Sequence, residues 1–188
     1  MLIRDDHRVA SLPTRLEVDG LILRRERLGD EDLLATAVKA NLEHLRPWMP
    51  WATPEAAMVE TQRARLVQVE QMWHDDSDYS FLLLDASESA LLGVFGMHRR
   101  IGPGGVEVGY WLDRDATGRG YATAAAQALT TAALALDDVE RVEIHCDEAN
   151  ERSRRIPQRL GYRLDRIEPD GIEAPAEVGR SMVWIYPP

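Results

Sequence analysis

VEVGYWLDRDATGRGYATAAAQALTTAALAL, residues 106–136, contains a strand-like run, a glycine-bearing loop and an alanine-rich helical pattern in direct succession. Gly118 and Gly120 let the backbone of this loop turn without a Cβ penalty and aim successive N–H groups at one point. The helix that begins there adds its unpaired N–H donors and the positive end of its dipole. The segment therefore suits a phosphate group, although Gly-x-Gly alone also occurs in ordinary turns.

Three further segments carry a resemblance to a known family. They are residues 21–33 (LILRRERLGDEDL), residues 44–52 (HLRPWMPWA) and residues 150–162 (NERSRRIPQRLGY). Together with residues 107–129, they resemble the GCN5-related N-acetyltransferases (GNAT), and within that family the RimJ/RimL-like branch, which acetylates the N-terminal amines of ribosomal proteins. The sequence departs from the family at Asp115, where Gln or Arg is common, so backbone donors would have to replace one side-chain contact to the cofactor.

The resemblance implies an α/β (α+β) fold of the GNAT type. Its central sheet is mixed and mostly antiparallel, contains a splayed pair of parallel strands and is flanked by helices. A chain of 188 residues with 45% apolar composition fits one such domain and can bury a core. We expect residues 1–20 to form an N-terminal leader and residues 21–188 to form a single N-acetyltransferase domain.

Hydrophobic periodicity and turn residues predict the order of the elements. After a short strand at residues 21–23, Asp30 can cap a helix that ends near Pro47, and Thr53 can cap a second helix that runs towards Trp73. Three antiparallel strands follow, and a helical crossover then makes the next strand parallel to the third. The predicted strands are 80–84, 91–98, 106–112 and 139–146, and the predicted helices are 30–45, 53–73, 122–136 and 150–160.

Composition restricts the class of partner. The chain has 22 Lys and Arg against 32 Asp and Glu, a net charge of −10, which argues against direct binding of nucleic acid and favours a basic peptide or polyamine. Cys146 is the only cysteine, so it has neither a disulfide partner nor a zinc-ligand set. No apolar run approaches the ~20 residues of a membrane span. We expect a cytoplasmic protein without a metal or membrane anchor, which could form a homodimer.

The resemblance implies acetyl-CoA as the co-substrate. The N–H groups from Gly118 to Ala122 would hold its pyrophosphate, and the main chain near Tyr110 would bond the pantetheine and the thioester. Arg154 or Arg155 could reach the 3′-phosphate, whereas Arg119 is either a phosphate ligand or a solvated arginine. The predicted coenzyme-binding residues are Tyr110, Trp111, Leu112, Thr117, Gly118, Arg119, Gly120, Tyr121, Ala122, Asn150 and Arg155.

Acetyl transfer to an amine needs a neutral nucleophile, a stabilised oxyanion and help for the departing thiolate. An α-amine titrates near ~7.7–8.0 against ~10.4 for lysine, so it needs only a weak base. The resemblance assigns Glu107 as that base, often through water, and Ser153 as the partner of the coenzyme sulfur. From the residues alone, Glu107 could instead face solvent or pair with an arginine, and His98 and His145 could serve as bases or be structural. Cys146 lacks a paired base, which favours direct attack without an acyl-enzyme.

Trp48 and Trp51 lie in a proline-stiffened loop and are predicted, with His98, to bind the acceptor. The same tryptophans could instead pack as core or as a dimer contact. The expected acceptor is an N-terminal α-amine of a protein, such as a ribosomal protein, or a small-molecule amine; a lysine or polyamine stays open. A non-catalytic acyl-CoA-binding or sensing module is the alternative function. A dinucleotide oxidoreductase fits poorly, because the third glycine and an opening βαβ unit are missing.

Overall fold

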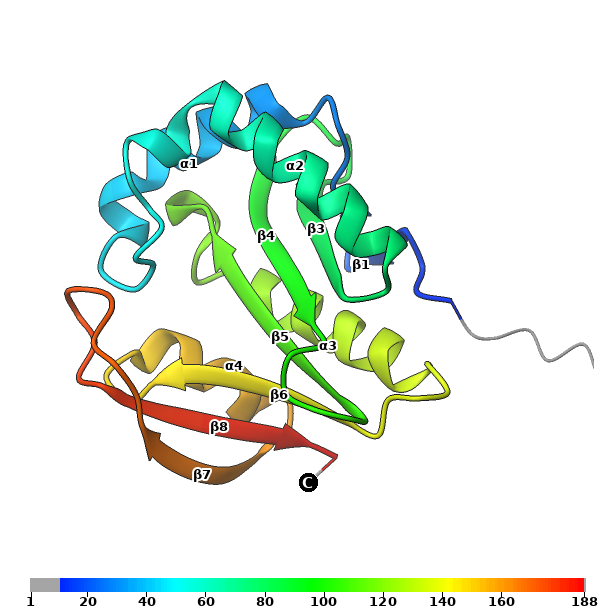
Figure 1. Cartoon of the computed structure of the whole chain (residues 1–188), viewed down its shortest axis with the longest axis vertical. Helices are drawn as coiled ribbons and strands as arrows, with labels where there is room; N and C mark the ends of the chain where they lie inside the picture. Colours follow the sequence, from blue (N-terminus) through cyan, green and yellow to red (C-terminus); the bar gives the residue numbers. More distant parts are fainter. Residues whose placement is uncertain (1–10, 188) are drawn as a thin grey trace, which may run out of the picture.

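The computed structural model describes residues 11–187, and in them one eight-stranded sheet lies between two sets of helices (Figure 1). The strands follow the order β1-β2-β3-β4-β5-β6-β8-β7 across the sheet. They are β1 (Arg15–Val18), β2 (Leu21–Arg25), β3 (Asp78–Asp85), β4 (Leu91–His98), β5 (Gly105–Leu112), β6 (Arg141–Asp147), β7 (Arg163–Pro169) and β8 (Arg180–Tyr186). The helices are α1 (Glu31–Leu45), α2 (Val59–His74), α3 (Tyr121–Leu134) and α4 (Glu151–Arg159), with 3-10 turns η1 (Glu55–Ala57) and η2 (Arg114–Ala116).

Strands β5 and β6 form the one parallel pair among the described strands, and they stay together over only three residues. Gly105 to Glu107 pair with Arg141 to Glu143, after which the two strands diverge (Figure 1). The other neighbouring strands are antiparallel, including the predicted β3-β4-β5 meander. The mixed sheet with a splayed parallel pair is therefore confirmed, and the splay leaves backbone groups of β5 beyond Glu107 without a β6 partner.

The sheet is buried on both faces in its central strands. Along β3, Phe81 and Leu83 pack into a core with α3, whereas Leu82 and Leu84 pack into a second core with α1 and α2. This follows from the alternation of side chains along a strand. The predicted apolar face of α3 is confirmed, and its small side chains let the helix lie close to the sheet: Ala122, Ala125, Ala126, Leu129, Ala132 and Ala133 are buried.

The first strand begins earlier than predicted. Residues 15–18, which we expected to belong to an unstructured leader, form β1 and pair with β2; residues 1–10 lie outside the described part of the chain. The connection is Asp19-Gly20, with φ of 50° and 77°. Two residues with positive φ are the signature of a tight hairpin turn, for which Asp-Gly is a known sequence signal. Asp19-Gly20 is therefore the sequence signal for this hairpin.

Two predicted helix starts need correction. Asp30 does precede α1, but its carboxylate accepts hydrogen bonds from the Arg24 guanidinium (3.0 and 2.9 Å) and from the Arg27 N–H (2.9 Å) instead of capping the helix. The predicted helix from Thr53 is divided into η1 and α2, because Met58 adopts an extended conformation between them. Strands β7 and β8 were not predicted.

Candidate active site

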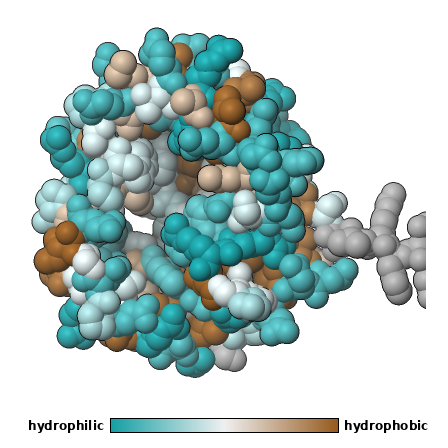
Figure 2. Space-filling model, in the orientation of Figure 1, coloured by the Kyte–Doolittle hydropathy of each residue, from teal (hydrophilic) through white to brown (hydrophobic). Residues whose placement is uncertain are grey.

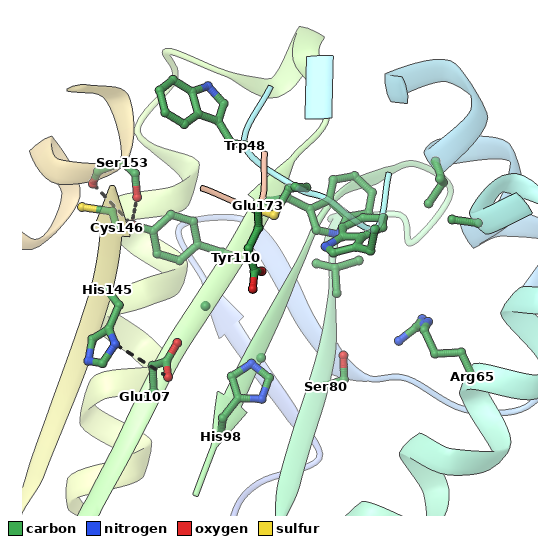
Figure 3. A pocket seen from close by; sticks show the side chains of 18 of the residues that line it. Trp48, Arg65, Ser80, His98, Glu107, Tyr110, His145, Cys146, Ser153 and Glu173 are labelled. Atoms are coloured by element: carbon green, nitrogen blue, oxygen red, sulfur yellow. Dashed lines mark hydrogen bonds and ion pairs between the residues drawn. The ribbon is translucent and has the colours of Figure 1, made fainter. Parts of the chain in front are cut away.

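A cavity of about 1020 Å³ lies where β5 and β6 separate (Figure 3). Residues from β4, β5 and β6, the segment joining α1 to α2, and the loop between β7 and β8 form its walls. The Ala176 N–H donates to the Pro47 carbonyl oxygen (3.0 Å), which connects the β7–β8 loop to the chain just after α1. Figure 2 shows an opening through the molecule in this region. The cavity is thus bridged on one side instead of being an open groove.

The loop between β5 and α3 presents unpaired backbone donors. Gly118 and Gly120 have φ of 76° and 85°, and an added Cβ would meet nothing within 4 Å at either position. The glycines are therefore required by backbone conformation and not by crowding. Within residues 11–187, the N–H groups of residues 118–123 have no hydrogen-bond acceptor, and the first turn of α3 contains no acidic residue. This fits the pyrophosphate of a coenzyme.

A buried amide fixes the start of this loop. The Asn41 side chain, 1% exposed on α1, donates to Asp113 Oδ2 (2.7 Å) and accepts from the Arg114 N–H (2.8 Å). Both contacts hold the chain immediately after β5. Sequence reasoning missed Asn41, although a polar residue on the apolar stripe of Leu34, Val38 and Leu45 was a usable signal.

Tyr110 and Ser153 meet at the end of the cavity where β5 faces α4. The Tyr110 hydroxyl lies 3.2 Å from Ser153 Oγ and donates to the Ser153 carbonyl oxygen at 3.4 Å. That carbonyl is free because Pro157 has no N–H to donate to it. Asn150 caps α4 as predicted, accepting the Ser153 N–H (3.1 Å). The sequence had pointed only to the main chain of Tyr110, so its hydroxyl is an addition.

Burial gives these groups high proton affinity. It raises the pKa of Tyr110 above the usual range for a phenol, and it raises the pKa of the neighbouring Cys146 thiol to about 11. Tyr110 therefore stays protonated, as a proton donor must, and Cys146 stays a thiol. A protonated thiol is a poor nucleophile, which agrees with direct transfer.

Glu107 lies on β5 at the last rung paired with β6, and its side chain is 10% exposed. Both carboxylate oxygens accept hydrogen bonds from the Arg100 guanidinium (2.8 and 2.7 Å). Burial raises the pKa of Glu107, but Arg100 outweighs burial, with further help from His145 and His98, and holds the pKa below its usual value. Pairing with an arginine was the alternative left open by the sequence.

The two histidines on the cavity wall have different partners. His145 Nε2 lies 2.7 Å from Glu143, whose other oxygen accepts from Arg141 (3.0 Å). His98 Nδ1 contacts the Asp78 carboxylate, and its ring points into the cavity (Figure 3). Each imidazole is therefore oriented by a carboxylate.

The predicted acceptor wall and the predicted arginines are placed as follows. Trp48 and Trp51 both line the cavity, and the Trp51 ring lies 6.3 Å from the Trp111 ring, centroid to centroid. Arg155 is exposed and pairs with Glu151 (3.2 Å). Three of the remaining predicted residues lie in the glycine loop or directly beside it: Thr117, whose hydroxyl donates to the Arg114 carbonyl oxygen (2.8 Å), exposed Arg119 and half-buried Tyr121.

The similarity of the chain to a known protein family identifies the kind of enzyme to which this cavity belongs. The family model described as "Acetyltransferase (GNAT) domain" matches residues 20–163. The chain belongs to the GNAT acetyltransferase family. It is an acetyl-CoA-dependent N-acetyltransferase, and the alternative of a non-catalytic acyl-CoA module is not favoured.

Among its relatives is YdaF of Bacillus subtilis, provisionally named a ribosomal N-acetyltransferase, which is 29% identical over 152 residues, 76% of this chain and 78% of the relative. Among solved structures, the ribosomal-protein-S5-alanine acetyltransferase of Vibrio fischeri has a TM-score of 0.83 at 19% identity, covering 92% of this GNAT chain and 96% of that one. RimL, a ribosomal L7/L12 alpha-N-protein acetyltransferase solved with coenzyme A, has a TM-score of 0.80 at 20% identity, covering 90% and 97%. These likenesses confirm the predicted fold.

Residues 11–187 contain no cluster of three or more His, Cys, Asp or Glu side chains placed to hold a metal ion. Among the same residues, no helix has the length and apolar character needed to span a membrane.

Proposed function

We propose that this GNAT enzyme acetylates the N-terminal α-amine of a protein. The observation that carries the proposal is the bridged cavity: it joins the β5–β6 gap, where the coenzyme arm belongs, to the tryptophan-lined space beyond it. The Ala176–Pro47 contact closes one side of the cavity, which favours an acceptor that enters end-on. A chain terminus can enter in this way. The names of the relatives, which concern ribosomal proteins, support the same class of acceptor.

The coenzyme would be held mainly by main-chain groups. The free N–H groups of residues 118–122 would bind the pyrophosphate, and the main chain of Tyr110, Trp111 and Leu112 would bond the pantetheine. Asn150, already capping α4, would also contact the pantetheine amide. Arg154 is a better candidate than Arg155 for the 3′-phosphate, since it has no ion pair within residues 11–187 and Arg155 is paired with Glu151. Bound acetyl-CoA supplies the activated acetyl thioester.

Ser153 would stabilise the departing sulfur, with Tyr110 as its partner. Their two hydroxyls lie 3.2 Å apart at the end of the gap, so either can hydrogen-bond a sulfur placed there while the other supports it. The raised pKa of Tyr110 keeps it a neutral hydroxyl that can hydrogen-bond the sulfur. Direct transfer then needs no covalent intermediate on the protein.

The sequence predicts Glu107 as a proton acceptor for the amine, acting through water, but Arg100 holds both of its carboxylate oxygens. Its lowered pKa makes it a weak base, which is sufficient only for an amine that is already largely neutral. Its pairing with Arg100 also supports a second role, in which Glu107 and Arg100 together define the wall at the point where β5 and β6 separate.

Trp48, Trp51 and His98 would line the path of the acceptor. The loop opposite them contributes Asp170, Glu173 and Glu177 to the cavity wall. With the net charge of −10, these acids favour a basic peptide such as the N-terminus of a ribosomal protein. A cytoplasmic location and a homodimer stay predictions that accompany this function.

Measuring thiol release from acetyl-CoA tests the proposal. The acceptors are a basic peptide with a free N-terminus, the same peptide with a formylated N-terminus, a lysine peptide blocked at its N-terminus, a polyamine and an aminoglycoside. We expect turnover with the free peptide and its loss on formylation. Equal rates with the blocked lysine peptide would contradict the α-amine assignment, and release with no acceptor at all would contradict the transferase function.

A further inference from the structure

His98 is held in one orientation by a neighbouring strand. It lies at the end of β4 and is the register partner of Asp78 on β3, and its Nδ1 contacts the Asp78 carboxylate. A carboxylate at Nδ1 favours the tautomer that has its proton there, which leaves the lone pair of Nε2 free. The two side chains are partly buried, with 28% and 30% of their surfaces exposed. Asp78 and His98 therefore form an oriented pair at the cavity wall.

Two glycines make room for the imidazole. Gly96 on β4 and Gly109 on β5 are register partners, so both lack a side chain at the same place on the sheet. A Cβ at Gly96 would lie 2.6 Å from His98 Nε2, and a Cβ at Gly109 would lie 3.5 Å from it. The ring thus lies over a glycine floor that a larger residue at position 96 would not permit.

The glycine floor also places Nε2 beside the reacting region. Gly109 is two residues beyond Glu107, the last β5 residue paired with β6, and it precedes Tyr110, whose hydroxyl contacts Ser153. His98 Nε2 therefore lies where the β5–β6 gap begins, in the same cavity as the predicted acceptor-binding residues Trp48 and Trp51.

Glu107 is less suited than His98 to take a proton. Both Glu107 oxygens are engaged by Arg100, whereas His98 Nε2 has no hydrogen-bond partner within residues 11–187. A second cavity, of about 320 Å³, has Asp78 and His98 in its wall together with Arg100. His98 and Arg100 therefore line both cavities.

We propose that His98, oriented by Asp78, is the general base of this acetyltransferase. The proposal rests on the proposed function. The nitrogen of the acceptor amine forms a bond to the thioester carbonyl carbon, and His98 Nε2 takes a proton from that amine. The carbon–sulfur bond then breaks, and the sulfur takes a proton from the Tyr110–Ser153 hydroxyls. Solvent returns that proton to the hydroxyls and removes one from His98. The products are the acetylated amine and the free coenzyme thiol.

Several charged or titratable groups surround His98 on the cavity wall. Asp78 faces it from β3 and contacts Nδ1, and Glu107 is its register partner on β5. Arg100 follows β4, Arg65 lies on α2 and His145 on β6; all three line the same cavity.

Replacing the imidazole and adding it back tests the proposal. In His98→Ala, the glycine floor leaves a space in which added imidazole can lie against Asp78. We expect kcat near pH 9, where an α-amine is neutral, to fall by about 100-fold or more, and added imidazole to restore at least a tenth of the wild-type rate. The KM for acetyl-CoA should stay within about threefold. Circular dichroism melting confirms that the variant is folded.

His145→Ala is the matched control, since His145 also lines the cavity and is also held by a carboxylate. It should lose less than tenfold and gain nothing from imidazole. A smaller loss than expected in His98→Ala, or a loss that imidazole does not reverse, would overturn the proposal while leaving the wild-type turnover, and with it the proposed function, intact. An independent readout is the imidazole tautomer by NMR: wild-type His98 should be protonated at Nδ1, and Asp78→Asn should abolish that preference. An unchanged tautomer in Asp78→Asn would overturn the orienting role.

Discussion

The Tyr110 hydroxyl lies 3.2 Å from Ser153 Oγ, which brings a strand and a helix into contact at the end of the β5–β6 gap. The two residues are 43 positions apart in the chain. Their contact depends on two local features of α4: the Asn150 cap, which fixes the first turn, and Pro157, which leaves the Ser153 carbonyl free to accept from Tyr110.

Removal of either hydroxyl should slow chemistry without weakening the coenzyme complex. We expect kcat to fall by about 100-fold in Ser153→Ala and by a smaller factor in Tyr110→Phe, because each removes one hydrogen bond to the leaving sulfur. The double variant should lose less than the product of the two factors, since the groups act together. Steady-state kinetics and calorimetric titration with acetyl-CoA measure both effects. A multiplicative loss would show that the hydroxyls act independently.

Gly118→Ala should weaken coenzyme binding through the backbone. A non-glycine residue at φ near 76° costs about 1–2 kcal/mol, and relief of that strain would move the N–H groups that hold the pyrophosphate. Gly20→Ala is the control, since Gly20 has φ of 77° and equally open surroundings but lies in the β1–β2 turn. Both variants should lose similar stability in denaturant titrations, and only Gly118→Ala should lose affinity for acetyl-CoA. Equal affinities of the two variants for acetyl-CoA would argue against the loop as the pyrophosphate site.

Asn41→Ala should destabilise the fold and the coenzyme site together. It leaves the Asp113 carboxylate and the Arg114 N–H without their buried partner, a loss of about 1–3 kcal/mol in the free energy of unfolding. Chemical denaturation measures this loss. Asn41→Asp should be more damaging, because a second carboxylate would face Asp113. A stability unchanged in both variants would remove Asn41 from the support of the loop.

The Glu107–Arg100 pair predicts a pH dependence of stability. The pKa of Glu107 is lower in the folded than in the unfolded chain, where it is near 4.5, so the ionised carboxylate favours folding. Its contribution is fully present above pH 4.5 and is lost as the pH falls through the folded pKa. Melting temperatures of the wild type should therefore fall more steeply below pH 4.5 than those of Glu107→Gln. Parallel curves would contradict the lowered pKa.

Cys146→Ala should keep most of the activity. The thiol is buried and its pKa is raised to about 11, so it is not a nucleophile near neutral pH. We expect kcat within about fivefold of the wild type, and intact mass spectrometry of the wild type with acetyl-CoA should show no acetyl adduct. A stable adduct on Cys146 would contradict direct transfer.

Local sequence signals were sufficient for much of the fold. The apolar stripes of α1 and α3, the Asn150 cap and the limits of β4 agree with the structure because each depends on residues close together in the chain. The splay of β5 and β6 followed from the family resemblance and not from spacing. Strand β7 escaped prediction because it is mostly exposed and highly charged, and so lacks the alternation that marks a half-buried strand. Strand β8 is a mostly buried apolar run, so its sequence did contain a usable signal.

The site was predictable in its residues but not in their contacts. Glu107, His98 and Ser153 were each selected from the sequence, yet their partners Arg100, Asp78 and Tyr110 come from other elements or from distant positions. The glycine floor under His98 depends on the register of β4 with β5, which sequence does not specify. A role can be assigned to a candidate residue only when the strand register and the side-chain geometry are known.

A crystal structure of the protein with acetyl-CoA tests the central claim most directly. The account predicts the pyrophosphate on the N–H groups of residues 118–122, the pantetheine between β5 and β6, and the thioester sulfur beside Tyr110 and Ser153. A coenzyme whose pyrophosphate lies away from that loop, with the β5–β6 gap unfilled, would contradict it.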